Sequence, residues 1–153
     1  MPGRNKSRER ALQVLFSCDM RKLEVPEALD AFYTTLYATD DFPETRLDRD
    51  RFMEALVYGA VDKKAAIDET ITKHSQNWRL ERMPSVDRNI LRVATYELMR
   101  GESATAVIID EAIELARRFS GDESIGFING VLDAVAKDIE ATQPSPRPAG
   151  KTK

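Results

Sequence analysis

The chain has 153 residues, of which 42% are hydrophobic and 32% charged, with a formal net charge of −3. This composition is typical of a globular protein and excludes a disordered chain. No apolar run approaches the roughly 20 residues of a membrane span, and the N-terminal MPGRNKSRER lacks the apolar core of a signal peptide. We therefore expect a cytoplasmic protein without membrane contact.

The charge is unevenly distributed along the chain. Residues 1–10 carry a net charge of +3 and residues 147–153 another +3, so the residues between them carry −9. A basic arm on an acidic body suggests contact with a polyanion at one place and with a basic partner elsewhere. Charge alone leaves open the alternative that these terminal charges only solvate the chain ends.

Nearly every segment has the apolar spacing of an amphipathic helix, and none has a good strand signal. The first helix is predicted at about 7–21 and the second at about 26–38, which Pro26 can open as a first-turn proline. A polar, proline-containing loop at 39–47 precedes a long helix at about 48–75. The first half of the chain is therefore expected to be helical.

A junction from Trp78 to Pro84 leads to the second half, where Ser85 is a reasonable N-cap. Three more helices are predicted, at about 85–100, 104–119 and 122–140. The basic, proline-rich segment 143–153 is expected to be disordered. The sequence thus predicts one all-α domain over 1–142, made of two small bundles at about 5–77 and 78–142.

The sequence gives little support to a catalytic function. It contains no phosphate-binding glycine loop, no nucleophile elbow and no spacing of metal ligands. The single histidine, His74, is expected to cap a helix end or lie on the surface, and the single cysteine, Cys18, belongs to an apolar helix face. We therefore predict a binding protein that is not an enzyme and has no metal or cofactor.

The segment 126–135, GFINGVLDAV, combines a hairpin signal with helical spacing. A continuous helix is predicted by the stripe Ile128, Val131, Leu132, Val135 and Ile139. Gly126, Phe127, Gly130 and Ala134 lie on another face of that helix, although a helical glycine costs about 1 kcal/mol relative to alanine. Either another helix packs closely over the glycines, with Phe127 filling the seam, or Phe127 is open to stack on an unpaired base.

The segment RNKSRERALQVLF at 4–16 favours nucleic-acid binding. It has four cations in and before the first helical turns, which are Arg4, Lys6, Arg8 and Arg10. Gln13 and Phe16 follow at i and i+3 on one helix face. Cations for phosphates, an amide for a base edge and an aromatic ring for stacking are together typical of single-stranded RNA recognition.

Three motifs resemble the NusB family of transcription antitermination factors. They are RERALQVLF at 8–16, WRLERMPSVDRNILRVATYEL at 78–98, and DEAIELARRF at 110–119 followed by FINGVLD at 127–133. The resemblance implies about six to seven helices in two small perpendicular bundles. It also implies a heterodimer with the ribosomal protein NusE that binds the boxA element of nascent ribosomal RNA and helps to load an antitermination complex onto RNA polymerase.

The resemblance also assigns roles by position. The RNA-binding residues would be Arg4, Lys6, Arg8, Arg10, Gln13, Phe16, Glu123 and Phe127. The surface for NusE would lie around Glu81 and Asp87, and a homodimer of the free protein stays open. Phe16 replaces a tyrosine frequent in the family, which leaves stacking in place but puts any hydrogen bond there in doubt.

Two other function classes stay open. One is an RNA-docking module like that fused to ribosomal RNA cytosine methyltransferases, which would act in ribosome maturation and have no link to transcription. The other is a helical adaptor that binds only proteins.

Overall fold

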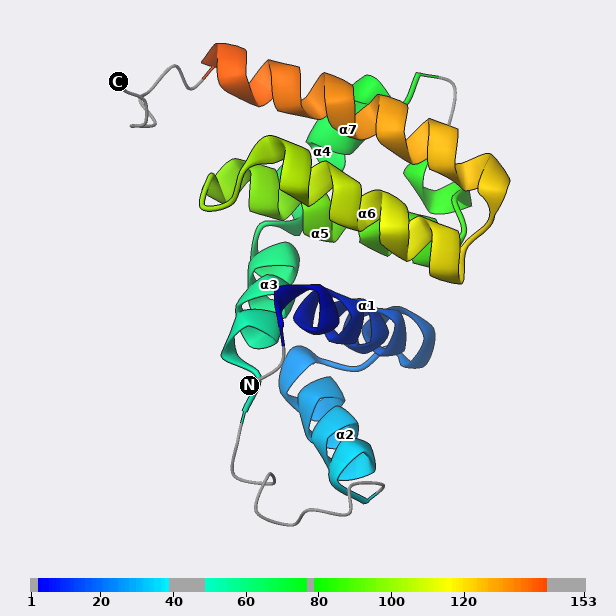
Figure 1. Cartoon of the computed structure of the whole chain (residues 1–153). Coiled ribbons are helices and arrows are strands. Elements are labelled where there is room, and N and C mark those ends of the chain that lie inside the picture. The colour runs from blue at the N-terminus through cyan, green and yellow to red at the C-terminus, as the bar shows by residue number, and fades with distance from the viewer. Residues whose placement is uncertain (1–2, 39–48, 77–78, 143–153) are drawn as a thin grey trace. The chain divides into compact units, whose positions relative to one another are not determined.

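The computed structural model describes residues 3–38, 49–76 and 79–142, all of them helical or in short connections (Figure 1). The helices are α1 (Arg4–Arg21), α2 (Val25–Ala38), α3 (Arg51–Asp62), α4 (Lys64–His74), the 3₁₀ helix η2 (Leu80–Arg82), α5 (Ser85–Arg100), α6 (Thr105–Phe119) and α7 (Asp122–Thr142). No strand occurs in these residues. The all-α prediction is confirmed, whereas the loop 39–47, Trp78 and the tail 143–153 lie outside the described residues.

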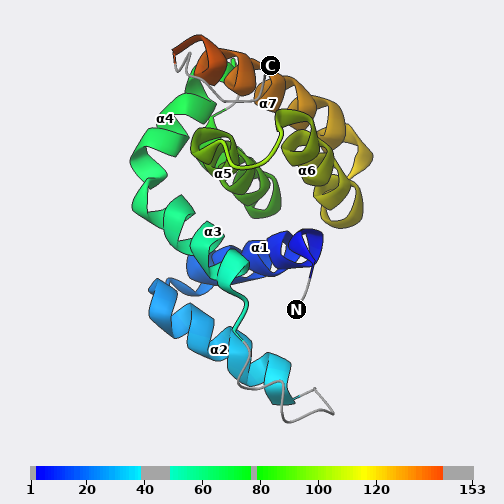
Figure 2. The same cartoon turned by 60° about the vertical axis from the view of Figure 1, so that its left-hand side comes forward.

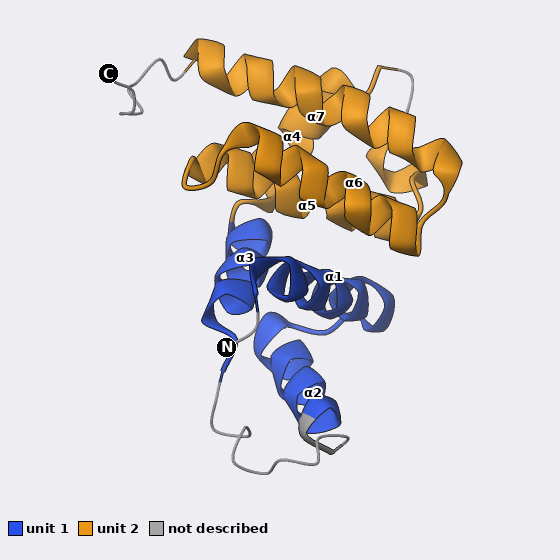
Figure 3. Cartoon of the chain, in the orientation of Figure 1, with its two compact units in different colours: residues 1–62 blue, residues 63–153 orange. Residues whose placement is uncertain are grey.

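The chain divides into two compact units, residues 1–62 and 63–153 (Figure 3). The sequence analysis put this boundary near residue 77, at the end of one long helix. The structure instead interrupts that helix at Lys63, whose backbone leaves the helical region with φ −106° and ψ 21°. The apolar spacing continues across the interruption, with Ile67 and Ile71 buried, so periodicity alone could not reveal it.

The first unit consists of α1, α2 and α3, with α1 packed against the other two helices (Figure 2). Asp50 connects them from the N-cap position of α3, where its carboxylate accepts a hydrogen bond from the Met53 N–H at 2.9 Å. The same carboxylate accepts bonds from Ser7 Oγ at 2.8 Å and from Arg10 Nη1 at 3.1 Å, both on α1. One buried side chain therefore fixes the start of α1 against α3.

The hydroxyl of Tyr33 extends this network to α2. It accepts a hydrogen bond from the Asp50 N–H at 2.9 Å and donates one to Glu54 Oε2 at 2.7 Å. Burial, followed by the hydrogen bond to Glu54, raises the pKa of Tyr33 well above its ordinary value. All three helices of the first unit are thus linked through polar groups as well as through their apolar faces.

The second unit is built around α5, which contacts α4, α6 and α7. α5 ends as predicted, because Gly101 adopts a left-handed conformation with φ 69° and its N–H bonds the Glu97 carbonyl at 3.0 Å. Its N-cap is Pro84 without a side-chain bond, one residue before the predicted Ser85. The core around it contains Ile90, Leu91, Ile108, Ile128 and Leu132.

α7 runs without interruption through Asn129-Gly130, as the apolar stripe predicted. Ile128, Val131, Leu132 and Val135 are buried on one face of this helix. Gly126 and Gly130 are exposed on its other side. In the described part of the chain, no helix is long and apolar enough to cross a bilayer.

Candidate nucleic-acid interface

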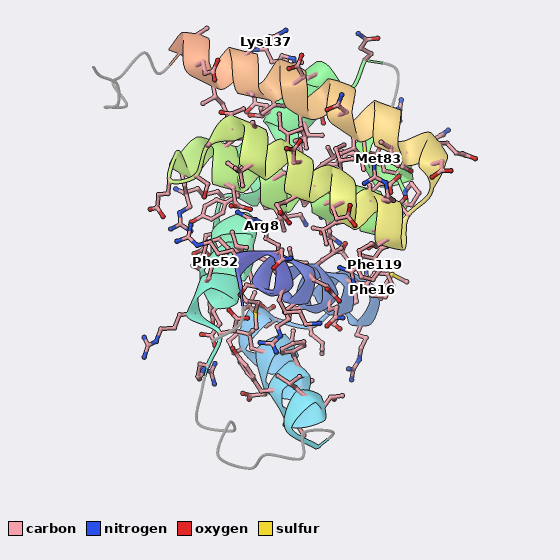
Figure 4. The ribbon with its side chains drawn as sticks, viewed as in Figure 1. Arg8, Phe16, Phe52, Met83, Phe119 and Lys137 are labelled. Atoms are coloured by element: carbon pink, nitrogen blue, oxygen red, sulfur yellow. The ribbon has the colours of Figure 1, made fainter. Side chains whose placement is uncertain are left out.

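The basic residues at the start of α1 surround the ring of Phe52 on α3. The guanidinium carbon of Arg4 lies 4.6 Å from the ring centroid and that of Arg8 lies 5.5 Å from it. Figure 4 shows Arg8 and Phe52 side by side. These are cation–π contacts, and Arg8 is only 4% exposed. Arg8 therefore contributes to the packing of the first unit, and its predicted RNA contact stays a prediction.

The side chains of Arg10 and Lys6 differ from each other in exposure. Arg10 is held by Asp50 in the polar network described above, and its side chain is mostly covered. Lys6 lies 3.7 Å from Glu9 and keeps a largely exposed side chain. Arg4 is also exposed. In this structure a phosphate could reach Arg4 and Lys6 directly, whereas reaching Arg8 or Arg10 would require their surroundings to rearrange.

The predicted amide and aromatic pair on α1 is accessible. Gln13 is exposed, and Phe16, one turn further on, is 42% exposed. Met20 extends this strip by another turn and is also exposed. The sequence analysis missed Met20 because a methionine at helical spacing usually belongs to a core face.

Phe127 lines a pocket of about 390 Å³ in the second unit. The pocket is formed by the end of α4 and one face of α7, through His74, Ser75, Gln76, Gly126, Phe127, Gly130, Val131 and Ala134. A Cβ atom built on Gly126 or Gly130 would meet no described atom within 4 Å apart from its chain neighbours and the adjacent backbone of its own helix. Close packing of another helix over these glycines is therefore wrong for the residues described, and stacking of Phe127 on an unpaired base stays a prediction.

The α4 side of the pocket carries polar groups with fixed positions. His74 Nε2 lies 2.9 Å from Asp138 Oδ2, and Lys73 Nζ lies 3.3 Å from the same oxygen. The hydrogen bond with His74, then that with Lys73, lowers the pKa of Asp138 below its ordinary value. Ser75 Oγ donates to the Ile71 carbonyl at 2.6 Å, and Gln76 follows with a φ of 53°.

The sequence analysis expected His74 at a helix end, and His74 does end α4. It did not anticipate that this helix end faces Phe127, because that proximity depends on how α4 packs against α7. No cluster of His, Cys, Asp and Glu side chains within the described ranges could hold a metal ion.

The acidic residues of the predicted sites lie in different environments. Glu123 is exposed in the first turn of α7, where a negative charge suits the helix dipole. Glu81 is exposed on η2 and lies 3.7 Å from the equally exposed Arg79.

Asp87 differs from both, since it is buried and accepts hydrogen bonds from Ser120 Oγ and, at 2.7 Å, from Ser124 Oγ. Asp87 thus fixes the turn between α6 and α7, and these two bonds occupy the carboxylate that the sequence analysis assigned to a partner.

Comparison with known proteins identifies the family. Residues 5–137 match the model of the NusB family. The transcription antitermination protein NusB of Solibacter usitatus is 52% identical over 149 residues, which cover 97% of each chain.

Two solved structures share the fold. NusB of T. maritima superposes with a TM-score of 0.74 at 32% identity, covering 90% of this chain and 92% of that one. A chain from a crystal structure of the antitermination factors NusB and NusE in complex with dsRNA gives 0.73 at 25% identity, covering 88% and 96%.

These matches confirm the resemblance seen in the three sequence motifs. They also confirm the prediction that the chain is not an enzyme, because the NusB family is a family of RNA-binding antitermination factors. The chain belongs to the NusB family of transcription antitermination proteins.

Proposed function

We propose that this chain binds single-stranded, boxA-like RNA of nascent ribosomal transcripts together with NusE, in the cytoplasm. The heterodimer would support loading of the antitermination complex onto RNA polymerase, and the free chain would be available for homodimer formation. The observation that carries this proposal is the open pocket beside Phe127, on a helix face that has glycine at two positions.

The first unit supports the same function through its exposed groups. Arg4 and Lys6 offer accessible cations for phosphates, and Gln13 and Phe16 offer an amide and a ring on one strip of α1. Arg8 and Arg10 hold this helix in place through Phe52 and Asp50. The predicted RNA-binding set therefore divides into groups that could contact RNA directly and groups that position them.

A basic partner suits the acidic remainder of the chain. NusE is proposed as that partner because a related solved structure is a complex of NusB and NusE with dsRNA. Glu81 offers an exposed carboxylate for this contact, and Asp87 contributes by holding the α6–α7 turn through its two serine bonds.

The proposal is tested by measuring RNA affinity in gel shifts with NusE present, on boxA RNA and on a scrambled sequence. Phe127→Ala should weaken binding of boxA RNA about 5- to 150-fold, the range expected for one lost base–aromatic stack. Val107→Ala, which truncates an exposed apolar residue of α6, is the matched control and should bind normally.

Equal affinity for scrambled RNA would contradict the proposal. Normal binding of NusE without any RNA binding would instead favour the helical adaptor, and co-purification with pre-ribosomal particles alone would favour a maturation role.

A further inference from the structure

We propose that Gln76 and His74, at the end of α4, read the edge of the base that stacks on Phe127 in the pocket between α4 and α7. This inference rests on the proposed function, since it specifies how the base at Phe127 is recognised. It adds two specificity-determining residues on α4 and just after it, together with Asp138 as a positioning residue on α7.

The size of the pocket suits a small planar ligand. Its volume of about 390 Å³ is near the lower end of the range for small-molecule sites in proteins. One side presents the ring of Phe127 between two glycines, which add no side-chain bulk over the helix. A flat aromatic group can therefore approach both the phenyl ring and the backbone of α7.

The polar groups of the pocket suit a base edge better than they suit a phosphate. The amide of Gln76 can both donate and accept hydrogen bonds, and His74, whose Nε2 is bonded to Asp138, keeps Nδ1 for one further bond. The carboxylate of Asp138 lies 2.9 Å from His74 Nε2 and so fixes the orientation of the ring. Sequence-specific RNA recognition uses this combination of stacking on one face and hydrogen bonds at the base edge.

The backbone at Gln76 ends α4. Its φ of 53° lies in the left-handed region, which is common just after a helix C-terminus, and Lys22 has the same conformation at the end of α1. This turn ends the helix with Gln76 at the pocket. The position would suit glycine, yet it carries an exposed amide at the pocket.

Two exposed lysines are available for the phosphates on either side of the base. Lys73 is in the last turn of α4, and Lys137 projects from α7 about one turn beyond Ala134 (Figure 4). Each makes a surface ion pair, Lys73 with Asp138 at 3.3 Å and Lys137 with Asp133 at 3.1 Å. Surface ion pairs of this kind contribute little to stability, so an RNA phosphate can take the place of the carboxylate beside each lysine.

The first experiment identifies the nucleotide that occupies the pocket. The fluorescent base 2-aminopurine is placed at each position of boxA RNA in turn, and its emission is recorded with the chain and NusE present. At one position the emission should be quenched by stacking in the wild-type complex and restored in Phe127→Ala. If no position shows quenching that is lost in Phe127→Ala, the assignment of a base to this pocket is overturned.

The second experiment tests the reading of the edge by replacing that nucleotide with the other three bases. The wild type should discriminate between bases about 5- to 150-fold, as expected when edge hydrogen bonds are matched or lost. Gln76→Gly should remove most of this discrimination while the fold is kept, because glycine adopts the observed φ without strain. His74→Ala should reduce the discrimination, and Asp138→Asn should reduce it by less.

Lys22→Gly is the matched control. Lys22 has the same unusual backbone, with φ 56°, at the end of α1 in the first unit. Lys22 is not among the residues that line the pocket, so its replacement, which relieves the same kind of backbone conformation, should leave base discrimination unchanged.

The outcomes separate the two proposals. If the wild type binds no RNA with NusE present, the proposed function fails. If it binds RNA and depends on Phe127, but Gln76→Gly changes the affinity for all four bases equally, only the reading by the α4 segment is overturned.

Discussion

Two buried aspartates show how a single carboxylate can organise several helices. Asp50 connects α1, α2 and α3 through bonds with side chains and backbone, and Asp87 connects α5 to the α6–α7 turn through Ser120 and Ser124. The family resemblance assigned Asp87 to a partner, which stays a prediction. Sequence reasoning gave Asp50 no role, because a carboxylate in a helical sequence is usually exposed. Burial of an acid depends on partners that are distant in sequence, 37 residues away for Ser124.

Replacing Asp50 should destabilise the first unit. Asp50→Ala removes the cap of α3 and leaves Ser7 and Arg10 without their carboxylate, so the free energy of unfolding should fall by about 2–4 kcal/mol. Urea denaturation followed by circular dichroism measures this change. Asp133→Ala on the exposed face of α7 is the control and should stay within about 0.5 kcal/mol of the wild type. Equal stabilities of the two variants would show that the Asp50 network contributes little.

The thiol of Cys18 should react slowly. Burial, and then the neighbouring charges of Asp19 and Glu24, raise its pKa above the ordinary value of 9.0. Less thiolate is therefore present at any pH below that value, and the thiolate is the reactive form. The rate of reaction with Ellman's reagent should rise with pH to a midpoint above 9.0 in the folded protein and should increase on unfolding in urea. A midpoint below this value in the folded chain would contradict the assignment.

At the scale of single elements, the sequence predicted α5, α6 and α7 nearly to the residue. Their apolar stripes are regular, and Gly101 marks a clear helix end. The sequence did not predict the interruption at Lys63, where the apolar stripe continues through a break in the helix, and it left the face around Phe127 ambiguous. A helical wheel separates the faces of one helix but cannot show which element lies opposite, so the pocket formed with the end of α4 had no sequence signal.

The open face of α7 leads to a prediction in which stability and binding change in opposite directions. Gly130→Ala adds a methyl group that meets no described atom within 4 Å beyond its chain neighbours and the adjacent helix backbone, so it should stabilise α7 by up to about 1 kcal/mol. The same methyl group narrows the Phe127 pocket and should weaken boxA binding. Thermal denaturation and gel shifts on the same preparation measure the two effects. A variant that is more stable and binds RNA normally would show that the glycine has no role in binding.

At the scale of the whole molecule, the charge distribution predicts how RNA affinity depends on salt. The chain carries a net charge of −3 despite its basic ends, so general attraction to a polyanion is weak and specific phosphate contacts should dominate the salt response. For single strands the slope of log affinity against log salt changes by about 0.7 for each phosphate contact. Arg4→Ala and Lys6→Ala should each reduce the magnitude of the slope by about this amount. Lys6→Ala should leave stability unchanged, whereas Arg4→Ala should cost about 0.5–1 kcal/mol through its lost contact with the Phe52 ring.

Arg8→Ala should behave differently from these two variants. Arg8 is buried against Phe52, so its truncation should lower the midpoint of thermal unfolding through lost packing. Affinity titrations from 50 to 200 mM salt (roughly the range over which phosphate contacts are resolved), combined with thermal unfolding of all three variants, separate contact from positioning. If Arg8→Ala flattened the slope with the unfolding midpoint unchanged, Arg8 would be a direct phosphate ligand, and α1 would have to expose it when RNA binds.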